Sequence, residues 1–181
     1  MEIIPTTIAG LVLIKPKVFE DERGYFFESF NAQKFEQLYG QQINFVQDNQ
    51  SLSQKGVLRG LHFQKPPDAQ GKLIRVVKGA VLDIAVDLRR NSPTYGQFET
   101  AELSETNKLQ MYIPKGFAHG FLTLEDDTVF TYKCTHYYAP SSEGCIAFND
   151  ETLNIPWPKM NYLVSEKDKL GESFKDFNSP F

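Results

Sequence analysis

Apolar and polar positions alternate over short stretches of this chain, and turn-forming residues separate the stretches. The stretches are rich in aromatic and β-branched residues, and clusters such as Asn91-Ser92-Pro93 and Pro140-Ser141-Ser142 interrupt them. Alternation with a period of two is typical of β-strands. The pattern predicts strands over residues 10–16, 24–30, 43–47, 57–63, 73–78, 81–87, 98–103, 109–113, 119–124, 128–137 and 144–148.

Helical signals are few. Asn31 can cap a helix over residues 32–39, and Gly40 can end it in a left-handed conformation. Ser165, with Asp168 three residues later, favours a second, short helical turn. Many short strands with a few short helices predict an all-β fold, a β-sandwich or jelly-roll barrel. No repeat, linker or shift in composition divides the sequence, so we expect residues 1–181 to form one domain.

Strand parity assigns side chains to faces. In the 81–87 strand, Leu82, Ile84 and Val86 share a face that must lie in the core. Asp83 lies on the opposite face, where it can be structural and hold a buried cation or backbone N–H groups. Over residues 128–138, alternation puts residues 130, 132, 134, 136 and 138 on one face, which groups Tyr132 with Tyr138. Parity thus places two phenols on one side of a strand.

Composition and charge indicate which kinds of binding partner and which cellular compartment suit the chain. The chain has 181 residues and a net charge of −4, which argues against a general nucleic-acid binder. It has no apolar run of membrane-spanning length and no signal-peptide pattern. Its two cysteines, Cys134 and Cys145, make no disulfide framework. We expect a cytoplasmic protein with free thiols that fill small packing positions.

Three cationic or titratable side chains stand within fourteen residues of strand-like sequence: Arg59, His62 and Lys72. Such groups are costly to bury unpaired, so this segment is expected to line a polar pocket. Arg59 and His62 have opposite parity, and both can face one pocket only if the strand breaks its alternation. Gly60 is where a bulge would do so. With Tyr132, the pocket would hold a base, an ammonium and a phenol, which proton transfer beside a carbonyl requires.

Seven ordered segments carry a family resemblance. The chain resembles the dTDP-4-dehydrorhamnose 3,5-epimerases, which have a cupin-type jelly-roll fold and act on a nucleotide-linked keto-sugar. The matching segments are residues 19–28, 47–49, 57–64, 70–72, 113–121, 137–140 and 165–168. Each alone is weak, but their ordered co-occurrence is specific. The stretch 170–181 carries no recognised motif.

The resemblance implies inversion of C3 and C5 of dTDP-4-dehydro-6-deoxy-D-glucose through an enolate, without a redox cofactor or a metal, on the way to dTDP-L-rhamnose. His62 would be the base, and Asp168 would fix its tautomer. Lys72 would stabilise the enolate oxygen. Tyr132 would be the acid on the opposite face, with Tyr138 as second candidate.

The resemblance also implies nucleotide contacts and an assembly. Arg59, His119 and Lys167 are assigned to the diphosphate and nearby groups, since guanidinium and ammonium groups suit phosphate. The further ligand contacts are Arg23, Glu28, Gln47, Asn49, Tyr138 and Glu143. Arg23 and Glu28 would reach the neighbouring subunit's site, so a homodimer with exchanged N-terminal strands is expected.

Other functions stay open. A metal-dependent cupin needs several converging histidines, but the chain has three in all, and Gln64 stands where a His-x-His pair would need a histidine. A non-catalytic sugar-nucleotide binding module would explain Arg59 and Lys167 but not His62 and Tyr132. A 3-only or 5-only epimerase, or a 3,4-ketoisomerase, would keep the fold and the nucleotide contacts.

Overall fold

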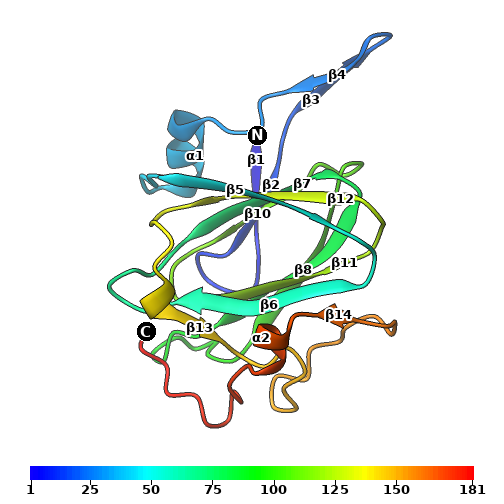
Figure 1. The fold of residues 1–181 in the computed structure, drawn as a ribbon. Coiled ribbons are helices and arrows are strands. Elements are labelled where there is room, and N and C mark those ends of the chain that lie inside the picture. The colour runs from blue at the N-terminus through cyan, green and yellow to red at the C-terminus, as the bar shows by residue number, and fades with distance from the viewer.

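A computed structural model describes residues 1–181, and two antiparallel sheets form its body (Figure 1). The first sheet has the order β1 (Glu2–Pro5), β2 (Val12–Lys15), β10 (Gln110–Ile113), β7 (Lys72–Lys78), β12 (Thr128–Cys134) and β5 (Gln47–Ser53). The second has the order β13 (Glu143–Cys145), β6 (Val57–Gln64), β11 (Phe117–Thr123), β8 (Ala80–Asp87) and β9 (Phe98–Ser104), with β14 (Leu163–Val164) parallel to β6. The predicted all-β fold is confirmed.

The main core lies between the two sheets. Most of its members come from strands of both sheets, because alternate residues of each strand point inward, and Ile8 and Leu11 come from the connection between β1 and β2. The largest buried cluster comprises Ile8, Leu11, Ile74, Val76, Val81, Ala85, Leu103, Met111, Ile113, Phe117, Phe121 and Phe130.

A second core covers the outer face of the second sheet. Leu82, Ile84 and Val86 face this outer core, where the C-terminal segment packs with Leu153 and Phe177. The predicted burial of that face is therefore confirmed, although Leu82 is only partly buried. The opposite face of β8 is also buried, since Val81 and Ala85 belong to the inner core. Asp83 stands between those two positions and is consequently fully buried.

The two predicted helices are confirmed. Helix α1 (Ala32–Tyr39) begins after Asn31, whose side chain accepts a hydrogen bond from the Lys34 N–H, and it ends at Gly40 with φ +81°. Helix α2 (Glu166–Lys169) is capped by Ser165 in the same way. A single 3₁₀ turn spans Pro140–Ser142. Neither α1 nor α2 has the length and apolar character of a helix that spans a membrane.

Several strand predictions were wrong. Residues 43–46 are irregular, and β5 instead covers Gln47–Ser53. Ile43 and Phe45 are apolar because they pack beside α1, whereas β5 is a polar edge strand without hydrophobic alternation. The 128–137 strand ends at Cys134, and the 144–148 strand shrinks to Glu143–Cys145. Strands β1 and β3 (Val18–Asp21) were not predicted.

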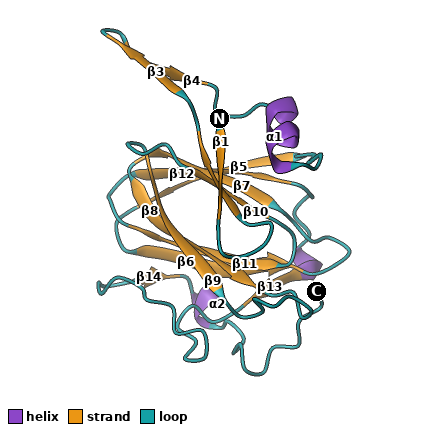
Figure 2. Cartoon of the chain, turned by 180° about the vertical axis from the view of Figure 1, so that it is seen from behind, coloured by secondary structure: helices purple, strands orange, loops and turns teal.

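A two-stranded hairpin projects from the body (Figure 2). It consists of β3 and β4 (Gly24–Phe27), which pair only with each other. Three of its aromatic side chains are largely exposed: Phe19 at 54%, Tyr25 at 57% and Phe26 at 70%. An isolated hairpin with exposed aromatic rings is the kind of surface that protein interfaces cover.

Candidate active site

A cavity of about 290 Å³ opens between the two sheets. Strands β5, β6, β7, β11 and β12 supply its walls, so both sheets contribute. Its lining residues are Asn49, Gln50, Ser51, Arg59, His62, Lys72, His119, Phe121, Phe130 and Tyr132. The structure thus brings together the four residues predicted for one polar pocket, from segments far apart in the sequence: Arg59, His62, Lys72 and Tyr132.

A bulge in β6 lets Arg59 and His62 share this cavity. His62 pairs with His119 and Arg59 pairs with Phe121, so two residues of β6 oppose one of β11. The bulge contains Gly60, which has φ +125°. A Cβ at Gly60 would lie 2.5 Å from the Gly120 Cα, so the strand needs glycine here. The predicted break in parity is confirmed.

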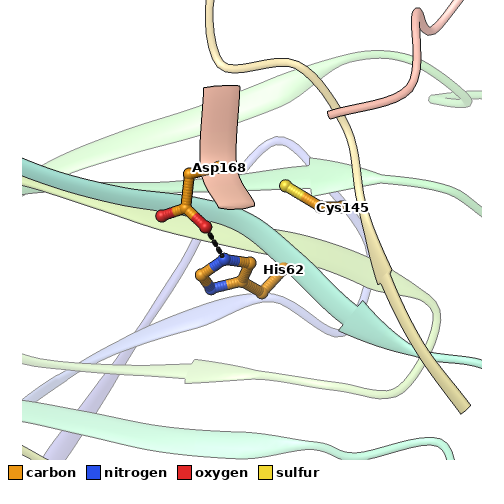
Figure 3. A group of neighbouring side chains, drawn as sticks. All are labelled: His62, Cys145 and Asp168. Carbon is orange, nitrogen blue, oxygen red and sulfur yellow. Dashed lines mark hydrogen bonds and ion pairs between the residues drawn. The ribbon is translucent and has the colours of Figure 1, made fainter. Parts of the chain in front are cut away.

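His62 forms a hydrogen-bonded pair with Asp168 from α2 (Figure 3). The His62 Nε2 and the Asp168 Oδ1 are 2.7 Å apart, and the second oxygen of Asp168 accepts the Gly60 N–H at 3.2 Å. Burial alone would raise the pKa of Asp168, but hydrogen bonds from His62 and Gly60 reverse this and lower it. Asp168 is therefore an anion positioned against one ring nitrogen of His62.

Cys145 lies beside this pair, a placement that the sequence did not indicate. It is the direct register partner of His62 across the β13–β6 pairing. Donor atoms of His62, Cys145 and Asp168 all lie within 4.8 Å of one another, so these three residues could hold a metal ion. Burial raises the pKa of the Cys145 thiol to about 12. At neutral pH the sulfur is therefore protonated, and a metal would first have to displace that proton.

Lys72 and Tyr132 face the cavity from the first sheet. The Lys72 Nζ lies 5.8 Å from the centroid of the Tyr132 ring. Burial lowers the pKa of Lys72 from its ordinary value and raises the pKa of Tyr132. The cavity therefore presents an ammonium that parts with its proton more readily than usual, beside a phenol that stays protonated.

The His119 ring contacts the buried carboxylate of Asp83. The His119 Nε2 lies 3.0 Å from the Asp83 Oδ2, and both side chains are buried. The His119 ring also stacks on Phe130, with 6.1 Å between the ring centroids. Burial lowers the pKa of His119 despite the neighbouring carboxylate. Parity reasoning placed Asp83 opposite the apolar face of β8, but it did not identify His119 as its partner.

A polar network joins further predicted residues. The Tyr138 hydroxyl donates to Glu143 at 2.8 Å, and the Lys167 ammonium donates to the same carboxylate at 2.6 Å. Gln47 accepts the Tyr138 backbone N–H and donates to Asn49, which itself lines the cavity. The structure thus links these five residues into a single network.

Arg23 and Glu28 do not line the cavity of their own chain. Arg23 is at the tip of the β3–β4 hairpin, where it pairs with Asp21. Glu28 pairs with Lys34 at 2.8 Å and accepts a hydrogen bond from Asn31. The structure therefore does not bring Arg23 and Glu28 together with the residues that line this cavity.

Comparison with known proteins identifies the family. The sequence profile described as dTDP-4-dehydrorhamnose 3,5-epimerase matches residues 5–176. The chain belongs to the dTDP-4-dehydrorhamnose 3,5-epimerase family. The epimerase of that name from Salmonella typhimurium is 56% identical over 158 residues, which cover 87% of this chain and 86% of the relative.

Solved structures of epimerases share the fold. The dTDP-6-deoxy-D-glucose-3,5-epimerase of Legionella pneumophila, in complex with dTDP-4-keto-L-rhamnose, is 49% identical with a TM-score of 0.94 and covers 98% of this chain and 94% of its own. The 3′-monoepimerase of Streptomyces bikiniensis, in complex with dTDP-quinovose, is 33% identical with a TM-score of 0.90 and covers 97% and 88%. These likenesses confirm the predicted cupin-type fold.

Proposed function

We propose that the chain inverts C3 and C5 of dTDP-4-dehydro-6-deoxy-D-glucose through an enolate. The observation that carries the proposal is the His62–Asp168 pair, because His62 lines the same cavity as Lys72 and Tyr132. The C4 ketone of this sugar acidifies the hydrogens at both neighbouring carbons. A base, a cation and an acid are then sufficient for the chemistry. The family and the Legionella pneumophila complex support this class of substrate.

His62 acts as the base. Its Nε2 faces the Asp168 carboxylate, an acceptor, so the neutral ring carries its proton on Nε2. The lone pair is then on Nδ1, which takes a proton from C3 or C5. The buried Asp168 carboxylate stabilises the positive charge that develops on the ring in this step.

Lys72 stabilises the enolate. Removal of the proton places negative charge on the C4 oxygen, and an ammonium in a partly dehydrated cavity interacts strongly with it. Because burial lowers the pKa of Lys72, its N–H groups are stronger hydrogen-bond donors than those of an exposed lysine.

Tyr132 returns a proton from the opposite face. Burial raises the pKa of Tyr132, so the phenol stays protonated until it donates its proton to the carbanion-like carbon of the sugar. Tyr138 is the second candidate, but its hydroxyl already donates to Glu143. This difference in hydrogen bonding favours Tyr132.

Arg59, His119 and Lys167 bind the diphosphate and nearby groups. The Arg59 guanidinium has only the Ser53 hydroxyl as a hydrogen-bond partner, at 3.4 Å, so most of its donors are available. Lys167 pairs with Glu143, and the Tyr138–Gln47–Asn49 hydrogen bonds connect that carboxylate to the lining of the cavity. Gln47, Asn49, Tyr138 and Glu143 supply further ligand contacts.

Two subunits exchange their β3–β4 hairpins in a homodimer. The exposed rings of Phe19, Tyr25 and Phe26 would be buried by a partner, and Arg23 at the hairpin tip would reach the partner's cavity. Mixing two inactive variants tests this arrangement. His62→Asn and Arg23→Ala subunits together form mixed dimers, in which one site has an intact His62 and receives an intact Arg23. Activity should reappear on mixing, and no recovery after subunit exchange would refute an action of Arg23 across the interface.

Isotope exchange tests the reaction itself. Incubation with the keto-sugar nucleotide in deuterated water should place deuterium at C3 and C5, as read by NMR. Exchange at one carbon alone would instead indicate a single-site epimerase. His62→Asn should lose exchange at both carbons, by roughly a hundred- to ten-thousand-fold, while it still binds dTDP.

In the same assay, Tyr132→Phe distinguishes proton removal on one face of the sugar from proton return on the other. This variant keeps the ring but lacks the transferable proton, so exchange from the His62 face should continue while epimer formation falls much further. An equal fall in both would remove Tyr132 as the second-face acid.

A further inference from the structure

Three side chains with metal-binding donor atoms meet beside the cavity, and the proposed reaction uses only two of them. His62 from β6, Cys145 from β13 and Asp168 from α2 have their donor atoms within 4.8 Å of one another. The Cys145 sulfur lies on the same side of the imidazole ring as the Asp168 carboxylate (Figure 3). Its thiol makes a single weak contact, with the Ile146 carbonyl at 3.5 Å. Cys145 therefore offers an available sulfur donor to the His62–Asp168 pair.

The pairing of two strands fixes Cys145 in this place. Leu61 and Ile146 exchange two backbone hydrogen bonds, at 3.2 and 2.9 Å. In an antiparallel pair the neighbouring positions are not hydrogen-bonded to each other, and their side chains come closest together. His62 and Cys145 are partners at such a position. The fold therefore holds the sulfur next to the imidazole independently of any loop.

The three donors suit a tetrahedral cation. Zinc binds imidazole nitrogen and carboxylate oxygen at about 2.0–2.2 Å and sulfur at about 2.3 Å, so its ligand atoms lie roughly 3.3–3.7 Å apart. Donor atoms that are within 4.8 Å of one another reach this spacing through movements of roughly 1 Å. The second oxygen of Asp168 accepts the Gly60 N–H at 3.2 Å, and this bond would keep the carboxylate oriented towards the ion.

An ion can reach these donors from the cavity. The His62 side chain is 30% exposed and lines the cavity, and Cys145 is partly exposed. Three protein ligands leave the fourth position of a tetrahedral ion open, and water from the cavity can fill it.

We propose that His62, Cys145 and Asp168 form a binding site for a thiophilic divalent cation, zinc above all, and that the bound cation inhibits the enzyme. The inhibition rests on the proposed function of His62 as the base, whereas the binding does not. Coordination replaces the S–H bond of Cys145 with a metal–sulfur bond and releases the thiol proton to water. Because this proton must leave, the site selects cations that bind thiolate strongly and discriminates against Mg²⁺ and Ca²⁺, which prefer oxygen ligands.

The bound cation would disable the base through the tautomer of its ring. Without the cation, Asp168 holds the His62 proton on Nε2, and the lone pair on Nδ1 takes the proton of the substrate. A cation bound at Nε2 needs the lone pair of that nitrogen, so the neutral ring carries its proton on Nδ1 instead. Nδ1 then has no lone pair to offer, and proton removal from C3 and C5 stops.

Two cysteine variants test the site. Cys145→Ser replaces the sulfur with a poor zinc ligand of similar size, and Cys145→Ala serves the same purpose if the serine variant fails to fold. Cys134→Ser is the matched control, since Cys134 is the other free cysteine and is not part of the cluster. Added Zn²⁺ should inhibit deuterium exchange at C3 and C5 in the unaltered enzyme and in Cys134→Ser.

In Cys145→Ser, activity without zinc should be near normal, and the zinc concentration for half inhibition should rise roughly tenfold or more. Zinc that binds the diphosphate of the substrate would inhibit all of these enzymes alike. Equal zinc sensitivity of Cys145→Ser and the unaltered enzyme therefore overturns the proposal.

Cobalt provides a measurement that does not depend on activity. Co²⁺ added to the unaltered protein or to Cys134→Ser should give a near-ultraviolet cobalt–thiolate charge-transfer band, and Cys145→Ser should lack it. Absence of this band from the unaltered protein overturns the site, even where the epimerase reaction is confirmed. Bound cobalt with full exchange activity overturns the inhibition. Failure of the proposed function is a separate outcome, since it appears as absent exchange in the metal-free enzyme.

Discussion

Replacing Asp168 with asparagine should slow proton removal by His62 and leave dTDP binding nearly unchanged. The substitution keeps the size of the side chain and removes its charge. In the protein the carboxylate lies 2.7 Å from the His62 Nε2 and is 5% exposed, so the hydrogen bond is short, ionic and shielded from water. Bonds of this kind contribute about 1.5–3 kcal/mol. If that energy is realised mainly when His62 becomes charged, kcat should fall roughly ten- to a hundred-fold, at about 1.4 kcal/mol per tenfold.

Deuterium incorporation at C3 and C5 measures this loss, because His62 is the base for both steps of the proposed reaction. Binding of dTDP, measured by calorimetry, should change little, since Asp168 does not line the cavity. The loss should therefore appear in kcat and not in KM.

Asp150→Asn is the matched control for Asp168→Asn. Asp150 is 9% exposed and accepts backbone hydrogen bonds from Thr152, Leu153 and Phe174, so its loss destabilises the same C-terminal segment without touching His62. Near-normal exchange in Asp168→Asn, or an equal loss in both variants, would refute the argument that Asp168 works through the base.

Three further outcomes follow from the structure. Gly60→Ala should destabilise the fold by roughly 2 kcal/mol more than Gly24→Ala in thermal or urea unfolding. Both glycines have φ near +120°, but only a Cβ at Gly60 meets backbone, 2.5 Å from Gly120, and equal effects would contradict the steric argument. Asp87 should make stability acid-sensitive: burial alone would raise its pKa, but hydrogen bonds from Arg89 and its neighbours lower it from 3.8 to about 2. Its contribution of about 2 kcal/mol is fully present above pH 3.8 and is lost as the pH falls towards 2, so the fall in melting temperature over that range should be smaller in Asp87→Asn. Prolonged chelation should leave activity unchanged, and a loss that one added metal restores would place the protein among metal-dependent cupins.

The sequence pattern correctly predicts those elements whose conformation depends on residues close to one another in the chain. The strand at 81–87 and the helix after Asn31 are correct, because alternation and capping act within a few residues. The conflict of parity between Arg59 and His62 was enough to locate the bulge at Gly60. The pattern failed at β5, whose polar residues line a cavity instead of packing in the core.

Contacts between residues far apart in the chain cannot be predicted from local sequence pattern. From its own neighbourhood, Asp168 is only a carboxylate at the start of a helix, and only the family resemblance implied that it pairs with His62. Asp83 is conspicuous in the sequence because it interrupts an apolar strand, yet its partner His119 is 36 residues away. Cys145 gave no signal at all, since its place beside His62 depends on the pairing of β13 with β6.

The pairing of His62 with Asp168 also bears on the last step in the folding of the enzyme. The two residues are 106 positions apart, and β6 and the strands around it precede α2 in the chain. Every strand of both sheets, including the short β14, precedes Asp168 in the chain, and none of the strand pairings includes a residue of α2. A folding chain whose sheets have paired before α2 docks would therefore contain the cavity but not the proposed base in its final position, and it would gain catalytic competence only when its final helix docks.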